Sequence, residues 1–249
     1  MKFTTQHLFC PVAMACEMLE PRWTMLVLCE MWNGSSRFND IQRGVPAMSP
    51  SLLSKRLKGM QAKGLISRVK DPQTGRYDYV TTPMADKLKN VIYRLGEWAY
   101  ENVEADIDLS NLDAKFLMWN IRRKINTLEL PNRKITIQFI IHNPPEETTN
   151  YWLISKPQVE TDLCFSDPGL NVDLFLSCDL ASLSAAWIGK SSFNQEIDSG
   201  RITLIGNEQI ARNLSRWLTQ SVFASKSSCR IALPEVENEA LGLPLNYTS

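Results

Sequence analysis

The first hundred residues alternate hydrophobic positions at helical spacing with strong helix-ending signals. This pattern predicts helices over residues 11–19 and 22–32, interrupted by Pro21, and a short helix over residues 37–43. A further helix is predicted to begin after Ser49, a residue type that caps helices, and to continue to Ala62. The N-terminal region therefore reads as a compact series of short helices.

Two β-prone runs follow, over residues 65–70 and 76–82, and the turn-forming sequence 71–75 between them predicts a β-hairpin. Pro83 then opens a helix predicted to reach residue 103. Its apolar stripe offers more hydrophobic surface than one small domain covers, which favours a homodimer. The stripe is formed by Leu88, Ile92, Leu95, Trp98 and Ala99.

The pattern changes after the polar stretch 106–113, and the second half mixes strands with helices. Strands followed by helices, rather than strict alternation, indicate the α+β class. We expect two domains, residues 1–108 and 109–249. The predicted helices are 114–126, 180–189 and 208–223, and the predicted strands are 135–141, 151–155, 159–165, 172–178 and 201–205, the first four at hairpin-like spacing.

Charge changes this picture at one place. The chain of 249 residues has a net charge of zero, yet positions 37–76 hold nine Lys or Arg against two Asp, a local balance of +7. A basic stretch confined to one module is typical of a face that contacts DNA, although an ordinary solvated surface also explains such a run.

Other residue types exclude several function classes. Six scattered cysteines without a CxxC pair and only two histidines predict neither a zinc site nor a disulfide scaffold, so we expect no metal and no other cofactor. No apolar run approaches the roughly 20 residues that cross a bilayer, and residues 1–10 lack a signal-peptide core. We therefore expect a cytoplasmic protein without a membrane partner.

The predicted helix from Ser49 to Ala62 has the polarity of a DNA recognition helix. Leu53, Leu57 and Met60 form a buried stripe, and hydroxyls and lysines occupy the opposite side. A major groove about 12 Å wide admits one such helix, and the basic hairpin can reach the flanking backbone or minor groove. The alternative is a helical bundle whose hairpin only packs. The candidate DNA-binding residues are Arg37, Ser49, Ser51, Ser54, Lys55, Lys58, Arg68, Lys70, Arg76 and Tyr77.

These motifs, in this order and spacing, resemble the HxlR-type winged helix-turn-helix family. The resemblance covers about residues 10–108 and implies a transcriptional regulator that binds a palindromic operator in double-stranded DNA as a homodimer. It makes residues 49–58 the recognition helix and 70–76 the wing. Glu20-Pro21 departs from the Gly-containing turn that is usual in the family. The motifs are Cys10-Pro11-Val12, Arg22-Trp23-Thr24, Arg37-Phe38-Asn39-Asp40-Ile41, Ser49-Pro50-Ser51-Leu52-Leu53-Ser54-Lys55-Arg56-Leu57, Gly64-Leu65-Ile66-Ser67-Arg68 and Tyr79-Val80-Thr81-Thr82-Pro83.

The second half resembles the sterol-carrier-protein-like fold in short motifs such as Tyr151-Trp152-Leu153-Ile154 and Trp187-Ile188-Gly189-Lys190. That resemblance implies a sheet covered by helices over an apolar tunnel, and hence a hydrophobic small-molecule effector. The alternative is an ordinary packed core. The candidate ligand-binding residues, expected on faces that point inward, are Trp119, Phe139, Ile141, Trp152, Ile154, Leu163, Phe165, Leu174, Leu176 and Trp187.

The sequence contains no complete motif for catalysis. Gly189-Lys190-Ser191 ends like a phosphate-binding loop, but Ser184 occupies the position of the leading glycine. There is no G-x-S-x-G and no convincing triad, so we expect no enzyme and no catalytic residues.

Cys10 offers an alternative to a ligand switch. It precedes Pro11 at a helix start, where the helix dipole favours a reactive thiolate, and some members of the resembled family sense oxidants or electrophiles with a cysteine there. The other interpretation is an inert thiol, and Cys16 and Cys29 are expected in the core. Three hypotheses remain open: a ligand-responsive regulator, most simply a repressor; a redox regulator switched at Cys10; and a lipid-binding protein without specific DNA function.

Overall fold

The computed structural model describes residues 10–20, 23–72, 75–103, 113–143, 147–157, 159–221 and 224. The expected domain boundary at residues 108 and 109, the wing residues Gln73 and Thr74, and Cys229 lie outside these residues. The N-terminal unit contains, in order, α1 (Pro11–Leu19), α2 (Trp23–Trp32), α3 (Phe38–Gly44), α4 (Pro50–Ala62), β1 (Ile66–Lys70), β2 (Tyr77–Thr81), α5 (Pro83–Asp86) and α6 (Lys89–Asn102).

The helix ends follow the signals in the sequence. Ser49 caps α4 by accepting a hydrogen bond from the backbone N–H of Leu52 (3.3 Å), and Pro50 stands at the first helical position. Gly64 has a positive φ of 73° after the end of α4, a conformation that favours glycine, and the chain turns there into β1. The predicted recognition helix and hairpin are therefore confirmed within one residue at each end.

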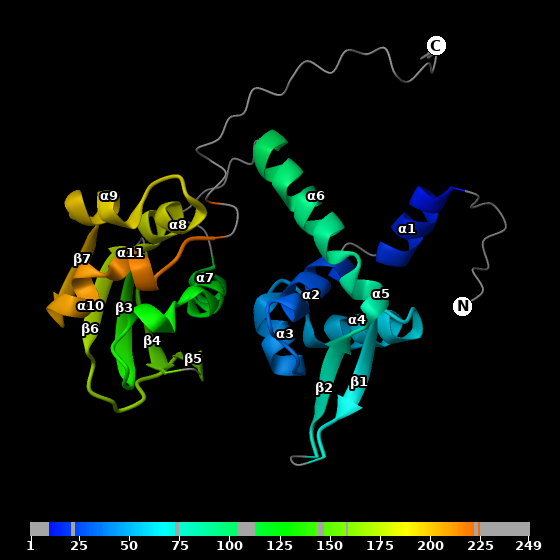
Figure 1. The fold of residues 1–249 in the computed structure, drawn as a ribbon, viewed down its shortest axis with the longest axis horizontal. Coiled ribbons are helices and arrows are strands. Elements are labelled where there is room, and N and C mark those ends of the chain that lie inside the picture. Colours follow the sequence, from blue (N-terminus) through cyan, green and yellow to red (C-terminus); the bar gives the residue numbers. More distant parts are fainter. Residues whose placement is uncertain are drawn as a thin grey trace, which may run out of the picture.

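The predicted helix from Pro83 to residue 103 is wrong in one respect, because it is broken. Four residues form α5, capped by the side chain of Thr82, and α6 begins at Lys89. Ala85 is fully buried at the break, and the backbone N–H of Leu88 bonds to the carbonyl of Ala85 (2.8 Å). In Figure 1, α6 extends away from the helices α2 to α5.

The C-terminal unit is a five-stranded sheet with short helices, which confirms the α+β class. The strand order is β5-β4-β3-β6-β7; β3 and β6 are parallel, and the other neighbours are antiparallel. Its elements are α7 (Ala114–Ile121), the 3-10 helices η2 (Arg122–Lys124) and η3 (Thr127–Glu129), β3 (Ile135–Asn143), β4 (Glu147–Lys156), β5 (Val159–Cys164), β6 (Leu174–Asp179), α8 (Leu180–Ile188), α9 (Phe193–Asp198), β7 (Ile202–Gly206), α10 (Glu208–Arg212) and α11 (Leu214–Trp217).

Several expectations about this unit need correction. The run from Val172 does not continue the hairpin series, because β6 crosses over and pairs with β3 in parallel. The predicted helix 114–126 ends as α7 at Ile121, and the predicted helix 208–223 is divided at Asn213 into α10 and α11. Helix α9 was not predicted; a capping box of Ser192 and Gln195 starts it.

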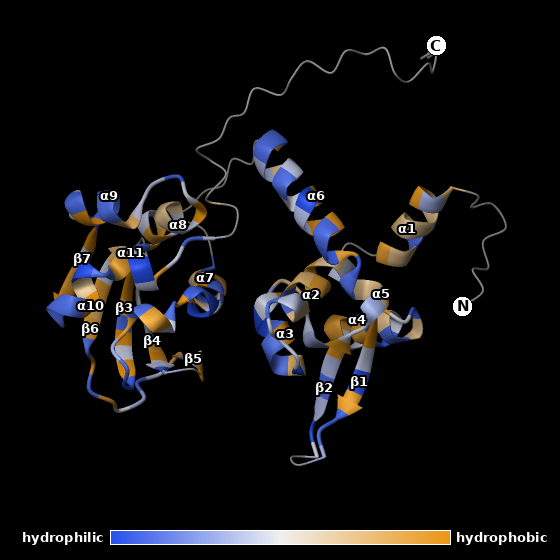
Figure 2. Cartoon of the chain, viewed as in Figure 1, coloured by the Kyte–Doolittle hydropathy of each residue, from blue (hydrophilic) through white to orange (hydrophobic). Residues whose placement is uncertain are grey.

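Each unit has its own hydrophobic core. Leu28, Ile41, Leu53 and Leu57 are at most 1% exposed in the first. In the second, the inward face of β3 packs against its strand neighbours and the helices around Met118, Leu183 and Trp217. Figure 2 shows α2 and the strands of the larger sheet coloured largely toward the hydrophobic end of the scale.

Candidate nucleic-acid interface

The polar side of α4 is open to solvent and carries the predicted groups. Ser49, Ser51, Lys55 and Lys58 are exposed and Ser54 is half-buried, whereas Leu53, Leu57 and Met60 on the opposite side are buried. The 13-residue helix is about 20 Å long, at about 1.5 Å per residue. Its hydroxyl-rich N-terminal turn and the two exposed lysines suit insertion into a major groove.

The hairpin of β1 and β2 forms a basic arm beside this helix. Arg68, Lys70, Arg76 and Tyr77 are all exposed, and the Arg68 guanidinium lies 3.8 Å from the centroid of the Tyr77 ring. This cation–π contact joins neighbouring strands and holds the arginine on one face of the hairpin.

The base of the hairpin is anchored to the loop before α3. The backbone N–H of Tyr79 donates to the carbonyl of Ser36 (2.7 Å), and the Ser36 hydroxyl donates to Asp78 (2.9 Å). Arg37 forms an ion pair with Asp78 (3.6 Å), so this candidate DNA contact also ties α3 to β2. The base of the hairpin is thus tied to the start of α3.

Two cations of the basic stretch serve the fold instead. The ammonium group of Lys63 donates to the carbonyls of Glu17 (2.6 Å), Met18 (3.0 Å) and Glu20 (3.1 Å) at the end of α1. It therefore satisfies helix-end acceptors and joins α1 to the end of α4. Arg43 pairs with Asp40 (3.0 Å) and lies over the ring of Trp119 in the other unit.

Helix α6 presents an apolar face that nothing in the described residues covers. Leu95 is 47% exposed and Trp98 56%, and Val91 and Val103 are also exposed. Ile92, which the sequence placed on the same stripe, is buried in the N-terminal core.

The candidate ligand-binding residues do not share one cavity. Leu174 and Leu176 pack with Phe139 and Ile141 in the closed sheet core, each at most 1% exposed. Trp152 and Ile154 are also buried, at 8% exposed each, but strand register pairs them with Gln138 and Thr136, so they lie on the sheet face opposite Leu153.

The remaining members of that set are divided between other places. Trp119, Leu163 and Ile154 line a cavity of about 380 Å³, whereas Trp187 lines a smaller apolar pocket of about 200 Å³ between α7 and α8. Phe165 is 42% exposed and contacts the edge of Tyr151 at 5.9 Å between ring centroids.

A buried polar cluster joins the two units, and no periodicity of the sequence predicts it. Glu30 on α2 is 4% exposed and accepts hydrogen bonds from Trp119 Nε1 (3.0 Å), the Ser35 hydroxyl (2.6 Å) and Arg123 Nη1 (3.0 Å). Arg123 also donates through Nη2 to the Glu30 carboxylate and to the Ser35 hydroxyl (2.6 Å). We call Glu30, Ser35, Trp119 and Arg123 the interdomain cluster.

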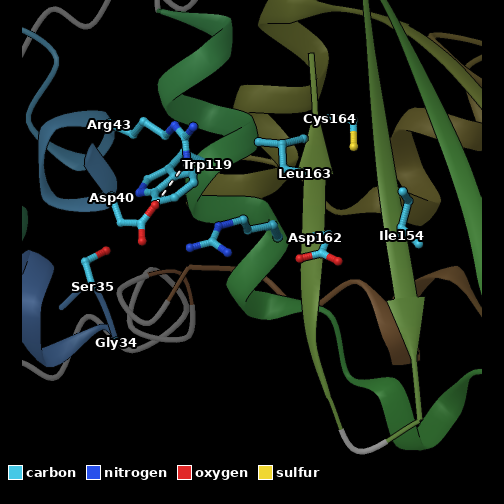
Figure 3. Close-up of a pocket in the computed structure, with 10 residues that line it drawn as sticks. Gly34, Ser35, Asp40, Arg43, Trp119, Ile154, Asp162, Leu163 and Cys164 are labelled. Carbon is cyan, nitrogen blue, oxygen red and sulfur yellow. Dashed lines mark hydrogen bonds and ion pairs between the residues drawn. The ribbon is translucent and has the colours of Figure 1, made fainter. Parts of the chain in front are cut away.

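The 380 Å³ cavity lies beside the interdomain cluster and has walls from both units. Gly34, Ser35, Asp40 and Arg43 come from the N-terminal unit, and in Figure 3 they face Asp162 and the other labelled residues of the C-terminal unit across the Trp119 ring. The Arg122 guanidinium stacks 3.7 Å from the centroid of that ring.

The cysteines differ sharply in accessibility. Cys10 is exposed immediately before α1; Cys16 is also exposed, which corrects its expected place in the core. Burial raises the pKa of Cys178 to about 12, and burial together with the Glu30 charge raises the pKa of Cys29. A raised pKa disfavours the reactive thiolate form of both cysteines.

Among the described residues, none of the helices is both long and apolar enough to pass through a bilayer.

Sequence comparison points to one family for the N-terminal unit. Residues 18–107 match the family model described as HxlR-like helix-turn-helix. The uncharacterized HTH-type transcriptional regulator YvaP of Bacillus subtilis is 32% identical over 91 residues, which are 36% of this chain and 84% of YvaP. An uncharacterized HTH-type regulator of Methanothermobacter thermautotrophicus is 30% identical over 36% of this chain and 69% of its own length.

Solved structures match each unit separately, at low overall scores. Reduced YodB from B. subtilis has 27% identity and a TM-score of 0.35, over 39% of this chain and 97% of YodB. Sterol carrier protein 2 from Yarrowia lipolytica has 16% identity and a TM-score of 0.35, over 45% of this chain and 93% of its own. The sequence matches carry the assignment: this chain belongs to the HxlR-like helix-turn-helix family of transcriptional regulators.

Proposed function

We propose that the chain is a sequence-specific, cytoplasmic transcriptional regulator, most simply a repressor, that binds a palindromic site in double-stranded DNA as a homodimer. The main support for DNA binding is the exposed polar side of α4 beside the basic hairpin. Ser49 caps this helix, and Lys55 and Lys58 lie on its exposed side. Membership of the HxlR-like family supports DNA binding. The cytoplasmic location is proposed because the protein must reach the DNA that it regulates.

The homodimer is inferred from the uncovered apolar face of α6. Exposed side chains of the size of Leu95 and Trp98 on one helix mark an interaction surface when they lie together. A two-fold pairing presents two α4 helices to successive major grooves, about 34 Å apart. This spacing is the reason for expecting a palindrome.

The experiment is selection from a random duplex library with the purified chain, followed by fluorescence anisotropy on the selected duplex. Lys55→Ala and Lys58→Ala should each weaken binding and lower the slope of log affinity against log salt by about 1. Lys190→Ala, an exposed lysine of the C-terminal unit, is the matched control and should change neither. Unselective binding by the wild type would favour the lipid-carrier hypothesis instead.

We also propose that the C-terminal unit binds a hydrophobic effector, but at a different place from the predicted tunnel in the sheet core. The sheet core around Phe139 and Leu176 is closed, so the apolar pocket lined by Phe116, Leu117 and Trp187 is the better place for such a molecule. Native mass spectrometry of the purified chain tests it: an apolar molecule that co-purifies with the wild type and is lost in Leu117→Gln supports it. A protein that carries none, and takes up none from added fatty acid, contradicts it.

Cys10 supports a second candidate function, a redox switch. Cys10 lies exposed at the start of α1, and Lys63 fastens the other end of that helix to the recognition helix. Oxidation at Cys10 therefore has a physical route to α4. Diamide with added glutathione, which oxidises an accessible thiol and glutathione to a mixed disulfide while the diamide is reduced, should change DNA affinity in the wild type and in Cys16→Ser but not in Cys10→Ser. If Cys10→Ser responds to this treatment as the wild type does, the switch is excluded.

A further inference from the structure

We propose that Glu30 and Arg123 are positioning residues for DNA binding: their buried ion pair docks the C-terminal unit on α2 and α3 and thereby holds α3 beside the recognition helix. The inference rests on the proposed DNA-binding function. It assigns the C-terminal unit a mechanical part in that function that needs no bound effector.

The first step is the cost of separating the pair. The side chains of Arg123 and Glu30 are 8% and 5% exposed, so neither charge reaches bulk water while the units are docked. Removing one partner of such a pair leaves a buried charge without compensation, which is strongly unfavourable. Trp119 and Ser35 add hydrogen bonds to the same carboxylate, so the Glu30 carboxylate keeps its full set of donors only when the units are docked.

The second step is the dependence of α3 on this contact. Helix α3 has seven residues, of which only Ile41 is fully buried, and a helix this short is marginal without tertiary contacts. Gly44, its last residue, lies so close to the Glu30 carboxyl group that a Cβ atom there would overlap it. Arg43 lies 5.3 Å from the centroid of the Trp119 ring.

The third step joins α3 to the DNA-reading helix. The Gln42 side chain donates to the carbonyl of Met48 (2.5 Å), immediately before the cap of α4. In a helix-turn-helix the first helix crosses the DNA backbone while the second enters the groove. A displacement of α3 therefore misplaces both the backbone contacts and the start of α4.

The cavity explains why the ion pair matters so much to docking. Beside the interdomain cluster the two units leave a partly open pocket of about 380 Å³ whose walls include the charged side chains of Asp40, Arg43 and Asp162, as Figure 3 shows. Because the walls of this pocket carry several charged groups, the buried polar cluster beside it is the contact that we expect to hold the units together there.

The test compares Arg123→Met with Arg133→Met in the full chain. Arg133 belongs to the same unit and pairs with Asp173 (2.8 Å), but its side chain is 51% exposed, so it controls for loss of an arginine and its ion pair. On a duplex selected by the wild type, Arg123→Met should raise the Kd about tenfold and Arg133→Met less than twofold. Equal affinities of the two variants would overturn the proposal.

Two further measurements separate positioning from general damage. Hydrogen exchange should speed up in residues 38–45 of Arg123→Met while the hairpin keeps wild-type rates; unchanged rates in α3 contradict the proposal. The double variant Glu30→Gln/Arg123→Met should bind DNA no more weakly than Arg123→Met, because both changes remove the same contact; a further tenfold loss would overturn the pairing. A wild type that selects no duplex defeats the proposed function itself, whereas normal wild-type binding with an unaffected Arg123→Met defeats only this inference.

Discussion

Gly44→Ala tests the packing of α3 on the interdomain cluster without removing any charged group. Gly44 has no positive φ, so its backbone accepts alanine, and helix propensity alone would favour the change by up to about 1 kcal/mol. The added Cβ, however, would overlap the Glu30 carboxyl group. That carboxylate is held by Arg123, Trp119 and Ser35 and cannot swing aside without breaking their hydrogen bonds.

The magnitude follows from these two opposing effects. Overpacking a tight site costs about 1–3 kcal/mol, which exceeds the propensity gain, so we expect Gly44→Ala to lower the free energy of unfolding by about 1–2 kcal/mol. Gly59 in α4 is the matched control, because a Cβ there meets nothing within 4 Å. Gly59→Ala should stabilise the protein by about 0.5–1 kcal/mol. Urea unfolding followed by circular dichroism measures both; an equal gain in the two variants would refute the packing argument.

Three other predictions concern separate parts of the chain. Lys63→Met should loosen α1, seen as faster hydrogen exchange over residues 11–19 with the rate of the hairpin unchanged, because it removes three hydrogen bonds to the end of that helix. The hydrogen bond from Arg201 lowers the pKa of Glu196, so the stabilisation is present at neutral pH and is lost as pH falls through that lowered pKa; Glu196→Gln should flatten the acid loss of stability, and parallel wild-type and mutant curves would argue against it. Trp98→Ala removes a large exposed side chain from the proposed dimer face of α6, so the sedimentation coefficient should shift toward that of the monomer. A dimer that is unaffected by this change would show that the interface lies elsewhere.

The N-terminal unit was predictable because its signals are local. Proline at the first position of α4, a serine cap and a glycine in the left-handed region after the helix act within a few residues, so they can be read before any tertiary contact is known. The break between α5 and α6 was missed because its cause is tertiary. Ala85 is buried against the core, and no proline or glycine interrupts the hydrophobic spacing there.

The larger sheet shows the limit of pattern reading more clearly. Alternation identified β3, but it cannot say which strand becomes its neighbour, and β6 pairs with it in parallel after a crossover that spacing alone does not reveal. For a related reason, the sequence did not show that Trp152 lies on the sheet face opposite Leu153. A strand buried on both faces loses the contrast between its two sides, so one register and its neighbour look alike.

The interdomain cluster could not be predicted from the sequence, and the physical reason for this also explains its importance. Glu30 lies on the apolar helix α2, where hydrophobic spacing treats a lone glutamate as an exception, and Arg123 is one of several cations near the end of α7. Their meeting depends on how two independently patterned units dock, and no periodicity within either unit encodes that. A buried charge in an otherwise apolar helix is nevertheless a readable sign that a partner exists, because it is too costly to leave unpaired. Glu30 is such a residue on a helix of the N-terminal unit, and it marks the point at which the C-terminal unit docks.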